Sequence, residues 1–313
     1  MRVVVQNDKS RARRFLRAST PGARMCGGLA ALLVAALASG CAQDASPERD
    51  TPARQPLQAP PAGAQEGPEA KARAERAAVV AAAKRWNLGR APLVAPPPPA
   101  EKPVITARAG FEVDGQEDLP PVFTTIPTED KVVFLTIDDG AEKDPEFLRM
   151  MHELKVPYTV FLTDEEIKDD YGYFRKMRDL GVTLNNHTLT HPYLPALSYE
   201  QQRREICGMQ DVMEKQYGTR PVLFRPPYGN YNRDTLAAAK SCGIRYAPIW
   251  DEEVYVDHWE YREWDRSLHP GDIVLSHFRG HADWDGSMTD LARRFLDKVT
   301  AEGYAVARLE DYL

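Results

Sequence analysis

Two adjacent acidic residues at the end of an apolar run are the first residues of this chain that could do chemistry. Asp138 and Asp139 follow residues 132–137, Val-Val-Phe-Leu-Thr-Ile, and precede Gly140. Neighbouring side chains on a strand point to opposite sides, so one carboxylate can bind a cation while the other stays free as a base. Gly140 permits a tight turn that exposes both. Taken alone, the pattern is equally typical of a solvated Asp-Asp-Gly turn.

Two histidines four residues apart form the next pattern, His187-Thr188-Leu189-Thr190-His191. On one helical turn their imidazoles would face the same way and could bind one metal ion. Two histidines and one aspartate from a neighbouring strand end would leave metal positions open for water and a substrate oxygen. The alternative is a pair of ordinary loop histidines.

Arg225 and His277 each follow a further apolar run. Arg225 precedes Pro226 and Pro227, which stiffen the loop and fix the direction of its side chain. A buried arginine beside a carboxylate keeps that carboxylate ionised. His277, opposite an oxyanion, could protonate a leaving amine. Alone, these residues are equally typical of an exposed arginine in a turn and of a structural histidine.

The elements that must position these residues alternate between short apolar strands and amphipathic helices. This rhythm predicts an α/β fold with mainly parallel strands, arranged as a distorted (β/α) barrel of about seven strands. The carboxyl ends of the strands then form one face, and the polar clusters recur there. The expected strands are residues 132–137, 158–162, 182–184, 222–224, 246–250, 272–275 and 304–309. One helix is expected to begin at Asp144. Four further helices are expected over residues 173–180, 198–217, 234–242 and 288–301.

Four of these motifs, in this order, resemble those of the polysaccharide deacetylase family, also called the NodB-homology or carbohydrate esterase family 4 domain. They are Thr136-Ile137-Asp138-Asp139-Gly140, His187-Thr188-Leu189-Thr190-His191, Arg225-Pro226-Pro227-Tyr228 and Leu275-Ser276-His277. The resemblance covers about residues 128–313. It implies a hydrolase that removes acetyl groups from a polysaccharide.

The resemblance also implies a role for each motif residue. Asp139, His187 and His191 would hold a divalent metal, usually zinc and in some members cobalt or another ion. Asp138 would be the general base, and Arg225 would orient it. His277 would be the general acid.

Two further motif residues would contact the substrate. Leu275 would help to line the acetyl pocket, and the backbone N–H of Tyr228 would donate to the oxyanion. The motif that supplies an acidic partner for the catalytic histidine is altered here, so this partner is Asp251, Glu253 or Asp257, and we favour Asp251.

The N-terminal third predicts export and anchoring. Residues 1–41 combine a basic flank, a short apolar run from Gly27 to Gly40 and Cys41, which resembles a lipoprotein signal with lipidation at Cys41. A plain signal peptide is the alternative. Residues 42–100 are rich in proline and alanine and predict a disordered tether, with a short helix allowed over residues 69–86. Residues 101–127 are a lead-in segment, and residues 128–313 form the catalytic domain.

Charge and cysteine usage restrict the partners. The chain has a formal charge of −6, and residues 101–313 contain 25 Lys and Arg against 39 Asp and Glu. An acidic folded part argues against nucleic acid as a partner, because phosphate binding needs a basic face. Cys207 and Cys242 remain in the mature part and can form a disulfide in an oxidising compartment, or stay as two thiols.

The sequence therefore predicts an extracytoplasmic, membrane-anchored enzyme, expected to be a monomer. It would remove N-acetyl groups from peptidoglycan or another N-acetylglucosamine polymer with a divalent metal, most often Zn²⁺. Two alternatives stay open. One is an esterase that acts on O-acetylated xylan or wall sugars at the same site, and the other is a wall-binding lipoprotein without activity.

Overall fold

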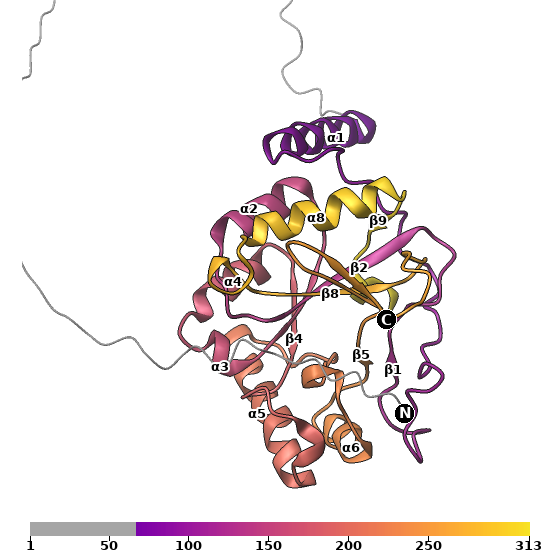
Figure 1. Ribbon diagram of the computed structural model, residues 1–313, viewed down its shortest axis with the longest axis vertical. Helices are drawn as coiled ribbons and strands as arrows, with labels where there is room; N and C mark the ends of the chain where they lie inside the picture. The colour runs from indigo at the N-terminus through magenta and orange to yellow at the C-terminus, as the bar shows by residue number, and fades with distance from the viewer. Residues whose placement is uncertain (1–66) are drawn as a thin grey trace, which may run out of the picture. The chain divides into compact units, whose positions relative to one another are not determined.

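The computed structural model describes residues 67–313, which form an α/β domain (Figure 1). The predicted signal peptide, the lipidation site Cys41 and the tether up to residue 66 lie outside the described residues. Within residues 67–313, no helix is long and apolar enough to cross a membrane.

A mostly parallel sheet forms the centre of the domain. Its hydrogen-bonded order is β4-β3-β2-β8-β6-β7, and β9 pairs with the first residues of β2. Only β7 runs antiparallel to its neighbour β6. The strands are β2 (Val132–Asp139), β3 (Thr159–Leu162), β4 (Thr183–Asn186), β6 (Glu252–Val254), β7 (Trp259–Tyr261), β8 (Ile273–His277) and β9 (Ala305–Val306).

Short bridges continue the sheet into a distorted barrel. Asn186 at the end of β4 bridges Phe224, and Leu223 bridges Tyr246. The small parallel pair β1 (Val122–Phe123) and β5 (Ala247–Pro248) follows, and Thr125 bridges Asp272 beside β8. The path therefore returns to the central sheet. The predicted distorted (β/α) barrel is confirmed, although several expected strands are reduced to two residues or a single bridge.

Helices cover the sheet from both sides. In Figure 1, α2 and α8 lie together above the central strands, whereas α5 and α6 lie together below them. The α-helices are α1 (Pro68–Arg85), α2 (Pro145–Leu154), α3 (Asp164–Ile167), α4 (Tyr171–Asp179), α5 (Tyr199–Tyr217), α6 (Arg233–Ser241), α7 (His281–Trp284) and α8 (Met288–Ala301). The 3-10 turns are η2 (Leu194–Ala196), η3 (Pro227–Gly229) and η4 (Leu309–Tyr312).

Local sequence signals set most helix boundaries. The Asp144 side chain accepts a hydrogen bond from the Glu146 backbone N–H at the start of α2, as its position before Pro145 predicts. Ser198 and Gln201 form a capping box at the start of α5, where the helix over residues 198–217 was predicted to begin. The last expected strand is shorter than predicted, because after β9 the chain turns into η4 at Leu309.

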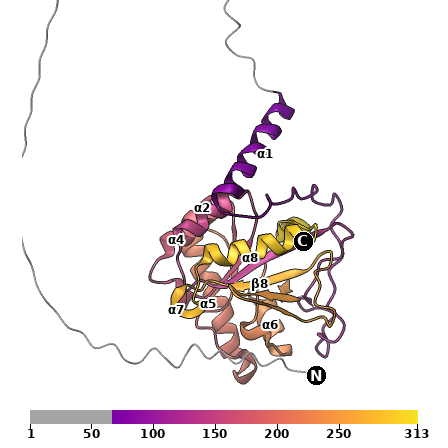
Figure 2. The same ribbon diagram turned by 45° about the horizontal axis from the view of Figure 1, so that its top comes forward.

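The short helix allowed over residues 69–86 is confirmed as α1, but the prediction of a disordered tether must be corrected for residues 67–100. The helix α1 packs against α2, and its residues Ala82 and Ala83 are buried in the main hydrophobic core. The Trp86 indole N–H donates to Glu153 at 2.8 Å. Proline and alanine content therefore misled the prediction, because one alanine-rich face of this helix is apolar enough to bury. Figure 2 shows α1 rising from the end of α2.

The lead-in segment also belongs to the domain. Val122 and Phe123 of β1 are buried and pair with β5, and Ile126 is buried in the same region. The Arg108 side chain reaches Asp251 at 2.6 Å. The proposed domain start at residue 128 is therefore too late, since apolar residues before it complete the barrel.

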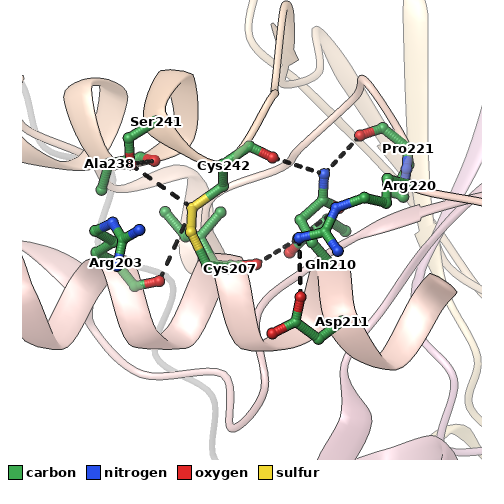
Figure 3. Close-up of a disulfide and its surroundings, with 11 residues drawn as sticks. Arg203, Cys207, Gln210, Asp211, Arg220, Pro221, Ala238, Ser241 and Cys242 are labelled. Carbon is green, nitrogen blue, oxygen red and sulfur yellow. Dashed lines mark hydrogen bonds and ion pairs between the residues drawn. A yellow bond between two sulfur atoms is a disulfide. The ribbon is translucent and has the colours of Figure 1, made fainter. Parts of the chain in front are cut away.

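A disulfide joins the two helices below the sheet. Cys207 of α5 is bonded to Cys242 at the end of α6 (Figure 3). Beside it, the Gln210 amide donates to the backbone carbonyls of Pro221 at 2.8 Å and Cys242 at 3.1 Å. The bridge and the amide together fix α6 against α5.

Removing this disulfide should destabilise the domain. The bond closes a sequence separation of 35 residues, so the Cys207→Ser/Cys242→Ser protein should lose about 2–4 kcal/mol of unfolding free energy. Denaturant unfolding of the oxidised wild type and the double variant measures this difference. The reduced wild type is the matched control and should resemble the variant, whereas identical stabilities of all three would contradict the prediction.

Candidate metal centre and catalytic site

The strand register brings the predicted site residues to one end of the barrel. Asp138 and Asp139 are the last residues of β2, and Asp138 pairs directly with His277, the last residue of β8. His187 follows the end of β4, and Arg225 follows the bridge at Phe224. Residues that are up to 139 positions apart in sequence therefore meet because their strands are parallel and end together.

Asp139, His187 and His191 form a compact cluster of metal-binding groups. Asp139 Oδ1 lies 3.6 Å from His187 Nε2 and 3.5 Å from His191 Nε2. Asp139 Oδ1 is buried and has no hydrogen-bond partner among the described residues. An orphaned carboxylate oxygen facing two imidazole nitrogens fits a divalent cation.

The histidines are prepared to act as neutral ligands. His187 Nδ1 lies 2.6 Å from the Arg225 carbonyl oxygen, and donation of its N–H there leaves the Nε2 lone pair facing the cluster. Burial lowers the pKa of both His187 and His191 to about 4, although Asp139 opposes this. Both rings are therefore neutral near pH 7, which metal binding requires.

The prediction that His187 and His191 share a helical turn is wrong. They lie in a loop, in which Thr188 and His191 have positive φ angles of 75° and 55°. The Glu205 carboxylate on α5 holds this loop by accepting from the backbone N–H groups of Leu189 at 3.1 Å and Thr190 at 2.9 Å. A loop thus achieves the convergence that a helix was expected to provide.

Strained backbone conformations concentrate at the site. Besides the two loop residues, Asp139 has φ 75° and Tyr228 has φ 61°. Such conformations are uncommon outside glycine and persist where the surrounding structure enforces them. Gly140, with φ 97°, could not carry a side chain, because a Cβ there would lie 2.5 Å from Ile167 Cγ2.

Arg225 holds Asp138 in place from inside the barrel. Its fully buried guanidinium donates from Nη1 to Asp138 Oδ1 at 2.8 Å and to Thr136 Oγ1 at 2.9 Å, and from Nε to the Pro248 carbonyl at 3.0 Å. The Phe161 ring lies beneath it at 4.3 Å. Asp138 is thus held by one oxygen, and its other oxygen, Oδ2, lies 3.6 Å from His187 Nε2.

The charges around Asp138 compete. Burial raises its pKa, and Asp139 raises it further, whereas Arg225 and His277 lower it, and the balance places the pKa at about 6. A carboxylate with this pKa is ionised near pH 7 yet basic enough to accept a proton.

Glu253, and not Asp251, is the acidic partner of His277. The Glu253 carboxylate Oε1 lies 3.1 Å from His277 Nδ1. Asp251, which we favoured, forms ion pairs with Arg108 at 2.6 Å and Arg262 at 3.6 Å. The pairing of Glu253 with Leu275 in the sheet explains this, because it places Glu253 diagonally beside His277.

The third alternative, Asp257, is exposed and pairs with its neighbour His258 at 2.6 Å. Among the three candidates, only Glu253 forms an ion pair with His277. Burial lowers the pKa of His277, but the contact with Glu253 and the charges of Asp139 and Asp138 outweigh it, and the pKa is raised. His277 is thereby suited to carry a proton.

Arg279 is a site residue that sequence reasoning missed. Its Nη2 lies 2.6 Å from Asp139 Oδ2, the oxygen that does not face the histidines. Burial raises the pKa of Asp139, but His191, Arg279, His277 and His187 outweigh it, so the pKa lies well below its usual range. The available signal was its position two residues after His277, at the same strand end.

Tyr228 and Leu275 both lie beside residues of the candidate site. The Tyr228 ring packs edge-on against His191, with centroids 4.5 Å apart. Leu275 is fully buried on β8, two residues before His277 and so on the same face of the strand. Trp284 of α7 also approaches His277 edge-on at 6.5 Å, a contact that no sequence pattern indicated.

Known proteins resemble this chain in sequence and in fold. Residues 125–247 match the polysaccharide deacetylase family. The chain is 39% identical over 220 residues to an uncharacterized protein of Streptomyces coelicolor, covering 69% of this chain and 86% of that protein. The chain belongs to the polysaccharide deacetylase family.

Two further comparisons extend this result. This chain is 27% identical over 201 residues to the peptidoglycan-N-acetylmuramic acid deacetylase PdaA of Bacillus subtilis. The match covers 59% of this chain and 73% of PdaA. A family 4 carbohydrate esterase from Bacillus anthracis superposes with a TM-score of 0.53 and 26% identity, covering 70% of this chain and 98% of that one. The deacetylase is thus a hydrolase of a divalent-metal-dependent family, and Asp139, His187 and His191 are its candidate ligands.

Removing the charge of Glu253 should change the pH dependence of the deacetylase. Glu253→Gln removes a charge that raises the pKa of His277, so His277 loses its proton at lower pH. The basic limb of the kcat/KM profile should move to lower pH, with up to about 100-fold lower activity at the alkaline end. Asp251→Asn is the matched control and should leave the limb in place. An unshifted limb in Glu253→Gln would exclude this role.

Proposed function

We propose that this protein removes N-acetyl groups from peptidoglycan or a related N-acetylglucosamine polymer, with zinc as its metal. The observation that carries the proposal is that the two adjacent aspartates at the end of β2 have different surroundings. Asp139 faces the two histidines, whereas Asp138 is held by Arg225 with its second oxygen turned toward the same cluster. Binding and proton transfer thus fall to different carboxylates.

A divalent ion held by Asp139, His187 and His191 would polarise the acetyl carbonyl and acidify a water molecule. Asp138 accepts a proton from the attacking water, and Arg225 keeps its carboxylate ionised and oriented. His277, which pairs with Asp138 across β2 and β8, gives its proton to the departing amine nitrogen, while Glu253 stabilises the imidazolium.

Two residues are proposed to bind the acetyl group. The backbone N–H of Tyr228 donates to the developing oxyanion, and the positive φ of this residue supports the assignment, because strained backbone is common where a peptide group is presented to a ligand. Leu275, buried below His277, forms the apolar floor for the acetyl methyl group.

The proposed substrate and location support each other. The relative PdaA is named as a deacetylase of N-acetylmuramic acid in peptidoglycan, and residues 1–41 predict an exported lipoprotein anchored at Cys41. A monomer on the membrane, facing the wall, would meet peptidoglycan directly.

Product analysis tests the proposal. The zinc-loaded full chain is incubated with peptidoglycan, N-acetylglucosamine oligomers and O-acetylated xylan, and acetate and primary amine are measured. We expect equal amounts of acetate and new amine from the N-acetylated substrates. Acetate from xylan without new amine would instead establish the esterase alternative. No acetate from any polymer would favour the wall-binding alternative.

A further inference from the structure

A second cluster of metal-binding residue types lies at the opposite end of β8 from the candidate active site. Glu252 begins β6, Asp272 directly precedes β8, and His269 lies in the segment before it. One ligand atom from each lies within 4.8 Å of the others. The five residue steps from Asp272 to His277 span about 16 Å along a strand, so this cluster is separate from the catalytic centre.

The carboxylates of this cluster have oxygen atoms without partners. Glu252 is 1% exposed, and within residues 67–313 no N–H or hydroxyl group donates to its carboxylate oxygens, whose polar neighbour is the carboxyl group of Asp272. Asp272 is equally buried. Its Oδ2 accepts from the His269 backbone N–H at 2.5 Å, whereas its Oδ1 has no partner in the same part of the chain. Buried carboxylate oxygens are normally satisfied, so these three call for an explanation.

The imidazole of His269 is oriented as a ligand. Its Nε2 lies 3.1 Å from Asp265 Oδ2, and its Nδ1 lies 3.4 Å from Asp272 Oδ2. Donation of the Nε2 proton to Asp265 leaves the Nδ1 lone pair on the side of the cluster. A carboxylate that accepts from the outer nitrogen of a histidine is the common arrangement around protein-bound metals.

The nearby cationic side chains have other partners. The Lys298 ammonium pairs with Glu302, and Arg262 donates from Nε to the Trp250 carbonyl at 3.0 Å and lies 3.6 Å from Asp251. Among the ion pairs of the described residues, none includes Glu252. Within residues 67–313, Glu252 therefore has no cationic side chain in ion-pair contact, whereas Asp272 has the imidazole of His269 at 3.4 Å.

We propose that Glu252, Asp272 and His269 form a second divalent-cation site, which ties β6 to the start of β8. Two carboxylates and one imidazole suit zinc or manganese. The site is structural, because it lies at the end of the strands away from the catalytic residues. It would also hold the strand that carries Glu253, the partner of His277, next to β8.

Protons are the competing explanation for this cluster. Burial raises the pKa of Glu252, and the charge of Asp272 and a hydrogen bond between the two carboxyl groups raise it further. A proton shared between the two carboxyl groups would then replace the cation. The two explanations differ in whether added metal binds to and stabilises the protein.

The test uses the full chain with Asp139→Ala, which removes a ligand of the first site. The protein is stripped with chelator and dialysed against Zn²⁺, and its bound zinc and Tm are measured. We expect one equivalent of zinc and a raised Tm for Asp139→Ala, and neither for Asp139→Ala/Glu252→Gln. The matched control Glu260→Gln, which changes an exposed carboxylate on β7, should keep both in the Asp139→Ala background.

Absence of zinc and of any Tm response in Asp139→Ala would overturn the proposal and leave the shared proton. The proposal is also overturned if Asp139→Ala/Glu252→Gln binds zinc with the same affinity as Asp139→Ala. Should Glu252→Gln fail to fold, Asp139→Ala/His269→Ala replaces it, because the His269 side chain is 42% exposed and tolerates truncation. At least tenfold weaker zinc binding is expected there, and unchanged affinity would count against the site.

Discussion

Asp138→Asn is expected to lower kcat by about 10²–10⁴-fold while the protein keeps the metal content of the wild type. The amide cannot accept a proton from water, but it preserves the shape of the side chain and its contact with Arg225. Assays of acetate release, together with metal analysis of the same sample, check both parts.

Asp251→Asn provides a matched control for this substitution. It makes the same chemical change to another buried aspartate, which pairs with Arg108 and Arg262 outside the site. Its kcat should stay within about twofold of the wild type, since its carboxylate plays no part in proton transfer. Wild-type turnover by Asp138→Asn would show that the general base is another residue.

Asp139→Ala should remove the catalytic metal as well as turnover. The variant lacks the oxygen that lies between the two histidines, and metal stabilisation of the transition state is worth several kcal/mol. We expect a loss of one metal equivalent and a fall in kcat of about 10³-fold or more.

Comparison of the two aspartate variants makes this result specific. Asp138→Asn should lose turnover while its metal stays bound. Asp139→Ala should lose turnover together with one equivalent of metal. If both kept the same metal content as the wild type, Asp139 would not be a ligand. If both lost it, Asp138 would be a ligand instead of a free base.

The sequence predicts the site residues that are fixed by strand ends. Asp138, Asp139, Arg225 and His277 each follow an apolar run, and neighbouring parallel strands bring their carboxyl ends to the same end of the barrel. The barrel follows from the same alternation of strands and helices. These features depend on local patterns and on one general rule of α/β folds.

Features that depend on register could not be predicted in the same way. Three acidic residues were candidates for the partner of His277, and a shift of β6 by two residues would exchange Glu253 for Asp251. Only the pairing of Glu253 with Leu275 decides between them. The contact of Arg279 with Asp139 has the same origin, because a long side chain after a strand can point in several directions.

Composition was a poor guide to order before residue 101. Residues 67–100 share the alanine and proline content of the preceding segment, yet α1 buries Ala82 and Ala83 against the core. The small side chains allow close contact between helices, and Trp86 adds a hydrogen bond to Glu153. The sequence therefore allowed the helix itself, but not its packing against the core.

The most direct test of the central claim is metal-dependent release of acetate and amine from peptidoglycan. The full chain is stripped of metal, assayed, reloaded with Zn²⁺ and assayed again. We predict no product from the stripped protein and equal amounts of acetate and primary amine after zinc is restored. Equal turnover with and without metal, or no turnover with zinc demonstrably bound, would contradict the proposed function.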